Sequence, residues 1–238
     1  MWTYTSVILL MVIYELMVVP LLEILPEENL IFIAFVLGGI CCAQKTRYNA
    51  VQASQEIVPG LELGEGSGNM CNVCKRRVPS KACHCRVCQT CVFRREYHCK
   101  WLDCCIGLTN LKWYLACLLL SSAAFMYGSN LTMTTICHPY QFMGPILLPD
   151  DCSDVYSQLD TAICFVSSVY SLSIALVMLW HLAYHLWLMY LGTTTYERRL
   201  YKSENHYSQG LLENIRYLLC CKSPYFSYLT SSQYSYQR

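Results

Sequence analysis

Three blocks of sequence decide how this chain folds: C-N-V-C (residues 71–74), H-C-R-V-C-Q-T-C (84–91) and E-Y-H-C-K-W-L-D-C-C-I-G-L-T-N (96–110). The stretch Cys71–Asn110 that contains them holds nine of the chain's 17 cysteines and two of its six histidines. Zinc in proteins binds four nitrogen or sulfur ligands in a tetrahedron, and turns of the C-x2-C kind commonly supply them. The spacing therefore predicts a zinc-binding segment.

The cysteines and histidines divide into two sets of four ligands, each with three thiolates and one imidazole. The first set is Cys71, Cys74, His84 and Cys91, and the second is Cys85, Cys88, His98 and Cys105. The sets interleave along the chain, so two zinc ions would tie together a segment with too little apolar mass to fold alone. Closed four-ligand sites leave no position for water, so we expect structural zinc. The pairing stays open, because Cys83 and Cys104 adjoin ligands and could replace them.

Composition places the rest of the chain in a membrane. The 238 residues are 55% hydrophobic and 14% charged, which is too apolar for an ordinary soluble domain. Three of four apolar runs exceed the roughly 20 residues that a membrane span needs. The runs are Thr3–Leu25, Leu30–Ala43, Leu111–Ile136 and Thr161–Leu191. The sequence predicts an all-α integral membrane protein with four transmembrane helices and a cytosolic double-zinc domain between helices 2 and 3.

The positive charges decide the predicted orientation. All 17 lysines and arginines lie in two blocks, eleven within 45–112 and six within 198–238, and the segment 137–160 has four aspartates and no basic residue. Basic residues favour the cytosolic side of a membrane. We therefore expect the zinc-binding segment and both termini in the cytosol. The shortness of the second apolar run favours the thinner membrane of the ER or Golgi.

The predicted organisation has seven parts. They are a transmembrane hairpin over 1–44, a cytosolic linker over 45–70, the zinc-binding domain over 71–110, a transmembrane helix over 111–136, a luminal loop over 137–160, a transmembrane helix over 161–191 and a cytosolic tail over 192–238. In the luminal loop, Cys137 and Cys152 face an oxidising compartment. The sequence allows two interpretations of this pair, a disulfide or two free thiols. Cys41 and Cys42, at the membrane boundary, fit either S-acylation or apolar packing.

Cys99 is the thiol to which we assign chemistry. It is left over from both zinc ligand sets and lies shortly before the third predicted span, which holds it near the bilayer surface. A thiol is a good nucleophile even when only a few per cent of it is ionised.

On the fourth predicted span, His181 and His185 are four residues apart and share a helix face. A metal site is one interpretation of that pair, and polar contacts near the membrane interface are the one we favour.

The segment Cys71–Asn110 resembles the cysteine-rich domain of the DHHC family of protein S-acyltransferases (palmitoyltransferases). Every ligand position matches, and further matches are Pro79, Lys81, Trp101, Ile106–Gly107 and Asn110. The residues Thr194-Thr195-Tyr196-Glu197 resemble the family's T-T-x-E motif. The pattern Asn205-x-Tyr207-x2-Gly210-x3-Asn214 resembles its cytosolic C-terminal motif.

The resemblance implies a two-step acyl transfer. Cys99, at the last position of the family's D-H-H-C tetrad, would attack a long-chain acyl-CoA such as palmitoyl-CoA and hold the acyl group as a thioester. It would then pass the group to a cysteine of a substrate protein. The implied partners are acyl-CoA, membrane-associated substrate proteins with cytosolic cysteines and the lipid bilayer, with no nucleic acid.

The tetrad of this chain departs from the family's pattern, because it reads Glu96-Tyr97-His98-Cys99. His98 matches the zinc-binding histidine, whereas Tyr97 stands where the family has the histidine that acts as base toward the cysteine. Glu96, in place of the aspartate, is the second predicted catalytic residue, reaching the thiol directly with Thr195 holding it. General-base assistance contributes about 10²–10⁴-fold, so slowed transfer is expected. The alternative is a weak or inactive family member that acts as a membrane scaffold or partner.

Overall fold

The structure is a computed structural model that describes residues 26–56, 69–78, 81–143 and 146–200. The predicted first span Thr3–Leu25 and the predicted C-terminal motif within 205–214 lie outside the described residues. The chain groups into two compact units. Among the described residues, the first unit takes 26–41 and 116–182, and the second takes 42–115 and 183–200.

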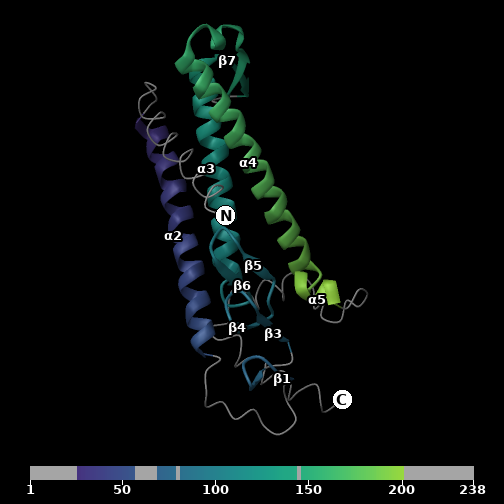
Figure 1. Cartoon of the computed structure of the whole chain (residues 1–238). Helices are drawn as coiled ribbons and strands as arrows, with labels where there is room; N and C mark the ends of the chain where they lie inside the picture. The colour runs from purple at the N-terminus through teal and green to yellow at the C-terminus, as the bar shows by residue number, and fades with distance from the viewer. Residues whose placement is uncertain (1–25, 57–68, 79–80, 144–145, 201–238) are drawn as a thin grey trace. The chain divides into compact units, whose positions relative to one another are not determined.

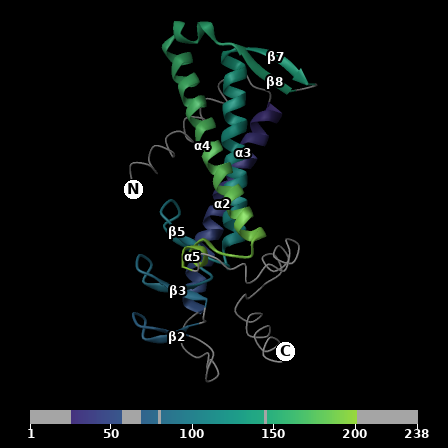
Figure 2. The same cartoon turned by 90° about the vertical axis from the view of Figure 1, so that its right-hand side faces the viewer.

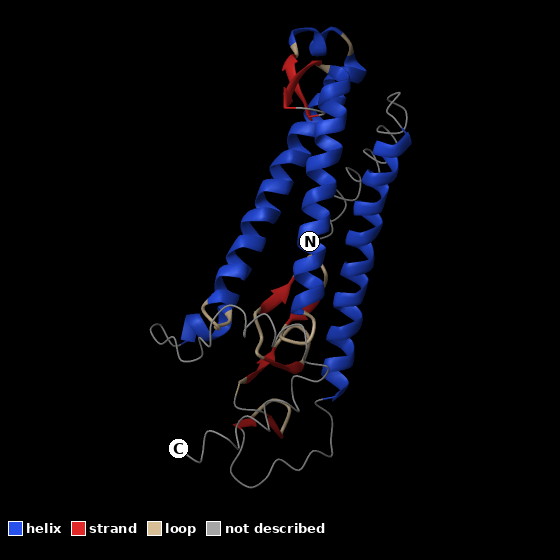
Figure 3. Ribbon diagram, turned by 180° about the vertical axis from the view of Figure 1, so that it is seen from behind, coloured by secondary structure: helices blue, strands red, loops and turns tan. Residues whose placement is uncertain are grey.

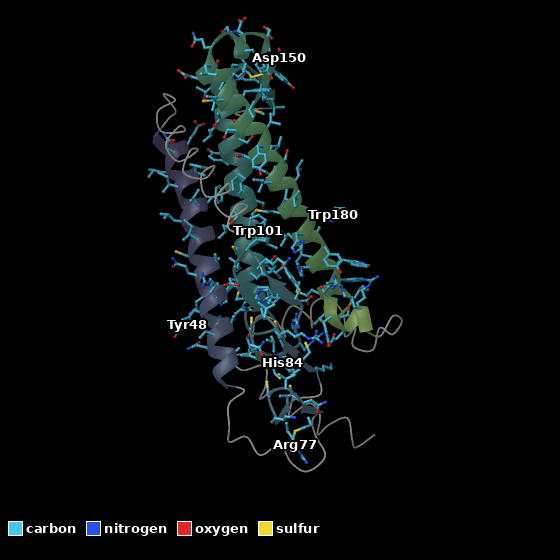
Figure 4. All side chains as sticks on the ribbon, viewed as in Figure 1. Tyr48, Arg77, His84, Trp101, Asp150 and Trp180 are labelled. Carbon is cyan, nitrogen blue, oxygen red and sulfur yellow. A yellow bond between two sulfur atoms is a disulfide. The ribbon has the colours of Figure 1, made fainter. Side chains whose placement is uncertain are left out.

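Three long helices carry most of the described chain: α2 (Pro26–Glu56), α3 (Leu111–Ile136) and α4 (Leu159–Tyr190). Each contains a stretch that is long and apolar enough to cross a membrane. Many of their large apolar side chains are exposed; Trp180 of α4 is 78% exposed and points away from its helix in Figure 4. Apolar and aromatic side chains on the outside of a helix fit a lipid environment. The described residues therefore hold three candidate spans, at the second, third and fourth predicted positions.

Helix α2 is longer than the sequence predicted. Its apolar pattern stops near Gln44, whereas the helix continues to Glu56 through part of the predicted linker. Within the second unit this extension is held by Thr46, which is fully buried and whose carbonyl accepts a hydrogen bond from Asn110 Nδ2 at 3.1 Å. A helix of 31 residues is about 46 Å long. The apolar run Leu30–Ala43, whose shortness favoured a thin membrane, is thus only part of the longer helix α2.

Small residues in the first unit let the helices approach one another. A Cβ atom on Gly39 of α2 would lie 2.8 Å from the Oγ atom of Ser121 on α3, so a larger residue would displace the serine hydroxyl. Ser129 Oγ of α3 donates a hydrogen bond to the Ser168 carbonyl of α4 at 2.8 Å. Small residues and side-chain hydrogen bonds are what hold membrane helices together, since lipid provides no hydrophobic drive between them.

A β-hairpin and a short 3-10 helix connect α3 to α4 in the first unit. Strand β7 (His138–Met143) pairs antiparallel with β8 (Ile146–Asp151), and the helix η1 (Ser153–Ser157) follows. Figure 3 shows these strands in red next to the blue helices. Cys137 and Cys152 form a disulfide with their Cα atoms 4.6 Å apart. Of the two states that the sequence left open, the structure has the disulfide.

Six short strands form three antiparallel hairpins in the second unit, in which β1 pairs with β2, β3 with β4 and β5 with β6. Figures 1 and 2 show the hairpins one after another, with the β5–β6 hairpin nearest the beginning of α3. The all-α description from the sequence leaves out these hairpins, because strands of three or four residues show no clear alternation of apolar and polar residues. The bounds are β1 Asn69–Cys71, β2 Arg76–Val78, β3 Ala82–Cys85, β4 Thr90–Phe93, β5 Tyr97–Cys99 and β6 Cys104–Ile106.

Two residues at the end of the third hairpin fix its position in the second unit. A Cβ atom on Gly107 would lie 2.8 Å from Val92 Cγ1, so only glycine fits against the second hairpin. The Asn110 side chain is 1% exposed; its Oδ1 accepts from the Gly107 amide at 2.9 Å, and its Nδ2 donates to the carbonyls of Cys105 at 3.0 Å and Thr46 at 3.1 Å. One side chain thereby ties β6 and the beginning of α3 to the extension of α2.

We predict that Asn110→Ala destabilises the second unit by roughly 2–4 kcal/mol, because it leaves a buried amide and two buried carbonyls without their partner. Chemical unfolding in detergent, followed by zinc release, measures the effect. The control is Asn72→Ala, which changes an exposed asparagine in the turn of the first hairpin; its effect should stay within about 0.5 kcal/mol. Equal effects of the two substitutions would contradict the role given to Asn110.

Candidate functional site

The first predicted ligand set comes together at the joint between the first and second hairpins. Cys71 and Cys74 lie at the turn after β1, while His84 of β3 faces Cys91 of β4 in the strand register. The Sγ atoms of Cys74 and Cys91 are 3.7 Å apart, and His84 Nδ1 lies 3.2 Å from the first and 3.9 Å from the second. His84 is labelled in Figure 4. All four ligand atoms lie within 4.8 Å of one another.

The second predicted set forms the same arrangement one hairpin later. Cys85 and Cys88 lie at the turn between β3 and β4, while His98 of β5 faces Cys105 of β6. The Sγ atoms of Cys88 and Cys105 are 3.6 Å apart, and His98 Nδ1 lies 3.3 Å and 3.8 Å from them. Each set therefore combines the turn of one hairpin with the facing histidine and cysteine of the next.

Both groups have the chemistry and the spacing that zinc requires. Zinc–sulfur bonds of about 2.3 Å in a tetrahedron place two sulfurs roughly 3.8 Å apart. A hydrogen bond from the Cys74 amide, at 3.4 Å, is the main cause that lowers the pKa of Cys71 to about 7, which favours the thiolate. Cys83 and Cys104 belong to neither group in the described part of the chain. The two clusters can hold metal ions, and the geometry favours the pairing that the sequence predicted.

The three hairpins share one structural repeat, a strand that ends in a cysteine and is followed by a tight turn, with a period of 14 residues. The first strand of each hairpin ends in a cysteine, at Cys71, Cys85 and Cys99. Four residues later the backbone turns through a positive φ, at Lys75 (54°), Gln89 (54°) and Asp103 (49°). We call the segments 71–75, 85–89 and 99–103 the cysteine turns. Their sequences, C-N-V-C-K, C-R-V-C-Q and C-K-W-L-D, contain the repeat, although Leu102 in place of a second cysteine makes its third copy hard to see.

Cys99 is the first cysteine of the third turn, where the second cysteine is replaced by Leu102. Its side chain is buried at 2% exposure. The sulfur accepts hydrogen bonds from the Leu102 and Trp101 amides, just as the Cys71 sulfur accepts from the corresponding amides of the first turn. Burial raises the pKa of the Cys99 thiol, while the two amides and the Tyr97 hydroxyl act in the opposite direction. The third turn therefore holds a sulfur in the surroundings of a zinc ligand but outside either cluster.

The Glu96 carboxylate is fixed by the segment that follows α4. The Oε2 atom of Glu96 accepts hydrogen bonds from the Thr195 amide at 2.8 Å and from Thr195 Oγ1 at 2.7 Å. Burial raises the pKa of the Glu96 carboxyl, and the two bonds from Thr195 counteract part of that rise. The predicted contact between Thr195 and Glu96 is thus present. No hydrogen bond joins Glu96 to Cys99 among the described residues, so the carboxylate does not reach the thiol directly in this structure.

Thr195 is positioned by the beginning of the short helix α5 (Thr195–Leu200). Thr194 Oγ1 accepts from the Glu197 amide at 3.2 Å, and Glu197 Oε2 accepts from the Thr194 amide at 3.0 Å. This reciprocal pair is a capping box, which fixes the first turn of a helix. Arg94 adds a hydrogen bond to the Gly192 carbonyl at 2.7 Å and an ion pair with Glu197 at 3.5 Å. The T-T-x-E sequence therefore builds a rigid support for Glu96.

Tyr97 lies in a buried cluster of rings. Its hydroxyl is hydrogen-bonded to the hydroxyl of Tyr114 on α3 and to the Cys99 thiol. Burial raises the pKa of Tyr97, so the phenol stays protonated at neutral pH. The His185 ring of α4 stacks on the Tyr97 ring, with centroids 5.7 Å apart and 14° between the planes. His185 was noticed in the sequence only as one of two histidines on a helix face; its place beside the tetrad was not predicted, because no sequence spacing links positions 97 and 185.

The family model and the curated relatives that match this chain are all described as palmitoyltransferases. Residues 64–202 match the family model described as DHHC palmitoyltransferase. Palmitoyltransferase ZDHHC23-B of Danio rerio is 32% identical over an alignment of 167 positions, which covers 64% of this chain and 38% of that protein. Palmitoyltransferase ZDHHC23-A of Danio rerio is 36% identical over 104 residues, and Palmitoyltransferase ZDHHC23 of Homo sapiens is 30% identical over 104; each match covers 44% of this chain and 25% of the relative. The chain thus spans well under half the length of these curated relatives.

We predict that the purified protein contains two zinc ions and that neighbouring cysteines differ in their effect on this content. Cys105→Ser removes a ligand and should lower the content to about one ion per chain, because a structural site needs all four ligands. The matched control is Cys104→Ser, which should keep both ions. Atomic emission after gel filtration gives the metal-to-protein ratio. Loss of zinc in the Cys104 variant, with retention in the Cys105 variant, would show that the ligands are paired differently.

Proposed function

The chain belongs to the DHHC palmitoyltransferase family, and from this premise we propose that it is a protein S-acyltransferase. Cys99 takes a palmitoyl or similar long-chain acyl group from acyl-CoA, carries it as a thioester and transfers it to cysteines of membrane-associated substrate proteins. The observation that carries the proposal is the third cysteine turn. There, a buried sulfur has the amide donors of a zinc-binding turn while standing outside both ligand clusters.

The proposed chemistry needs little beyond a positioned thiolate. The Cys99 sulfur forms a bond to the acyl carbonyl carbon, and the bond from that carbon to the CoA sulfur breaks. CoA leaves as a thiolate and takes up the proton that the Cys99 thiol gave up. A second exchange of the same kind moves the acyl group to a substrate cysteine. Each step exchanges one thioester for another, so positioning rather than driving force is what the protein must supply.

The other predicted site residues have supporting roles in this proposal. Glu96, held by Thr195, keeps a carboxylate fixed next to the residues that contact the thiol. The two ligand sets hold structural zinc ions, which fix the hairpins that carry Glu96 and Cys99. The domain limits 71–110 and 192–238 predicted from the sequence remain the limits we propose for the catalytic domain and the tail.

We place the zinc-binding domain and both chain termini on the cytosolic side of a membrane, with four spans in all. The apolar run Thr3–Leu25 and the distribution of basic residues support this arrangement. Multi-pass membrane association follows from the three described helices and the family. The short apolar run Leu30–Ala43 supports an ER or Golgi membrane, because bilayer thickness is matched by the apolar stretch of a span and not by the whole length of α2.

A second function is supported by a specific observation. Burial raises the pKa values of both Cys99 and Tyr97, and the tyrosine cannot take a proton from the thiol at neutral pH. A family member without acyl transfer, which acts as a membrane scaffold or stabilises an active relative, would show the same features. Covalent labelling separates the two functions.

We predict that incubation with an alkyne analogue of palmitoyl-CoA labels the protein through a thioester at Cys99. The label should be released by hydroxylamine and be absent from Cys99→Ser. It should persist in Cys104→Ser, which changes the thiol that faces Cys99 across the hairpin. A folded wild-type protein with two zinc ions and no label at Cys99 would favour the scaffold.

We also predict that Thr195→Val slows formation of the thioester by about 10-fold. The substitution keeps the shape and the amide donor but removes the hydroxyl hydrogen bond to a buried carboxylate, a loss of roughly 1.4 kcal/mol or more. Thr193→Val is the matched control, because the Thr193 hydroxyl has no hydrogen-bond partner among the described residues. Single-turnover labelling at low temperature measures both rates, and equal rates in the two variants would remove Glu96 from the mechanism.

A further inference from the structure

His185 of α4 touches the thiol site from a distant part of the sequence. Its side chain is buried at 3% exposure. Its ring is stacked on Tyr97, and the Tyr114 ring meets it edge-on at 5.7 Å and 89°. Its Nδ1 atom lies 3.9 Å from Glu96 Oε2. A buried imidazole in a membrane-spanning helix is costly and by default marks a functional position.

These contacts form a continuous path to the reacting sulfur. Thr195 fixes the Glu96 carboxylate, and His185 faces that carboxylate with one nitrogen. At 3.9 Å the contact is longer than a hydrogen bond and is an electrostatic one. The His185 ring lies flat against Tyr97, whose hydroxyl is hydrogen-bonded to the Cys99 thiol. His185 is therefore the residue that connects the carboxylate to the phenol.

We propose that His185 is a positioning residue for Cys99 that acts through Tyr97: it links the Tyr97 ring to the Glu96 carboxylate and so holds the Tyr97 hydroxyl on the sulfur. This inference rests on the proposed function, since it assigns His185 a part in forming the Cys99 thioester. His185 does not contact the sulfur itself and exchanges no atom with the substrate. Its effect reaches the reaction only through the placement of Tyr97.

Packing alone would make a different prediction from positioning. If His185 only filled space between α3, α4 and β5, then an aromatic ring of similar size would replace it, and its loss would add to the loss of the Tyr97 hydroxyl. If His185 acts through Tyr97, then removing the Tyr97 hydroxyl first leaves His185 nothing to position. Residues that act through one another show non-additive effects in a double-mutant cycle.

The test is the cycle formed by His185→Phe, Tyr97→Phe and the double variant in the full chain. The phenylalanine at 185 keeps a ring to stack but has no nitrogen to face Glu96. We expect each single variant to form the palmitoyl thioester on the order of 10-fold more slowly, because Tyr97→Phe removes the hydroxyl hydrogen bond to the sulfur and His185→Phe removes the polar contact that holds the hydroxyl there. The double variant should be no slower than Tyr97→Phe. A rate for His185→Phe within twofold of wild type, or a double variant slowed by the product of the two single effects, would overturn the proposal.

His181→Phe is the matched control, because it changes the other histidine of α4 one turn earlier and should stay within about twofold of wild type. The zinc content of every variant reports folding. If His185→Phe loses zinc, His185→Asn takes its place in the cycle, since its amide nitrogen retains a donor toward Glu96 in a smaller side chain. The Asn variant should then be faster than His185→Ala, and equal rates of the two would count against the proposal.

A second readout separates this inference from the proposed function. The rate at which iodoacetamide alkylates Cys99, followed by peptide mass spectrometry, depends on the placement of Tyr97 and requires no acyl transfer. We expect the same non-additive pattern in the alkylation rates. If the wild-type protein forms no thioester, the proposed function fails while the alkylation cycle still decides the role of His185. If the thioester forms and the cycle is additive by both readouts, the role of His185 fails alone.

Discussion

The second unit depends on one geometric constraint: each of the first two cysteine turns must meet the facing histidine and cysteine of the next hairpin. Strands of three or four residues cannot hold a hairpin together in water without further support, and metal ligation at such joints contributes folding free energy directly. This constraint is satisfied at two places, the clusters that contain His84 and His98. After the third turn the chain enters α3 instead of another hairpin. Cys99 therefore has the backbone of a ligand turn with no second ligand pair, and the end of a structural repeat becomes the position of the thiol that we propose as the nucleophile.

The groups that hold the neighbours of the Cys99 thiol in place come from other elements. The carboxylate of Glu96 is fixed by Thr195, which follows α4 by a few residues and is itself set by the capping box of α5. The phenol of Tyr97 lies between α3 and α4, against Tyr114 and His185. The hairpin thus supplies the thiol, while the helices supply the groups that hold its neighbours in place. This division explains how a tetrad with Glu96 and Tyr97 can still form an ordered site.

Several parts of the structure could be predicted from the sequence because their determinants are local. The C-x2-C turns and the two histidines give both ligand groups, and the apolar run Leu111–Ile136 has the same bounds as α3. The 14-residue repeat was also present in the sequence, but Leu102 in place of a cysteine concealed its third copy. The extension of α2 to Glu56 could not be predicted, since the apolar pattern ends near Gln44 and the contact of buried Thr46 with Asn110 joins residues 64 positions apart.

The sequence by itself determined the family, the two cysteine–histidine clusters that can hold metal ions, the candidate spans and the position of Cys99 outside those clusters, because each of these depends on residue type and short spacing. Only the tertiary structure decided what surrounds that thiol. Glu96 turns to Thr195 and His185 instead of to Cys99, and Tyr97 takes the contact with the sulfur. The physical reason is that burial and ring stacking are set by which helix faces the hairpin. Residues about 90 positions apart meet there with no trace in the local pattern of the chain.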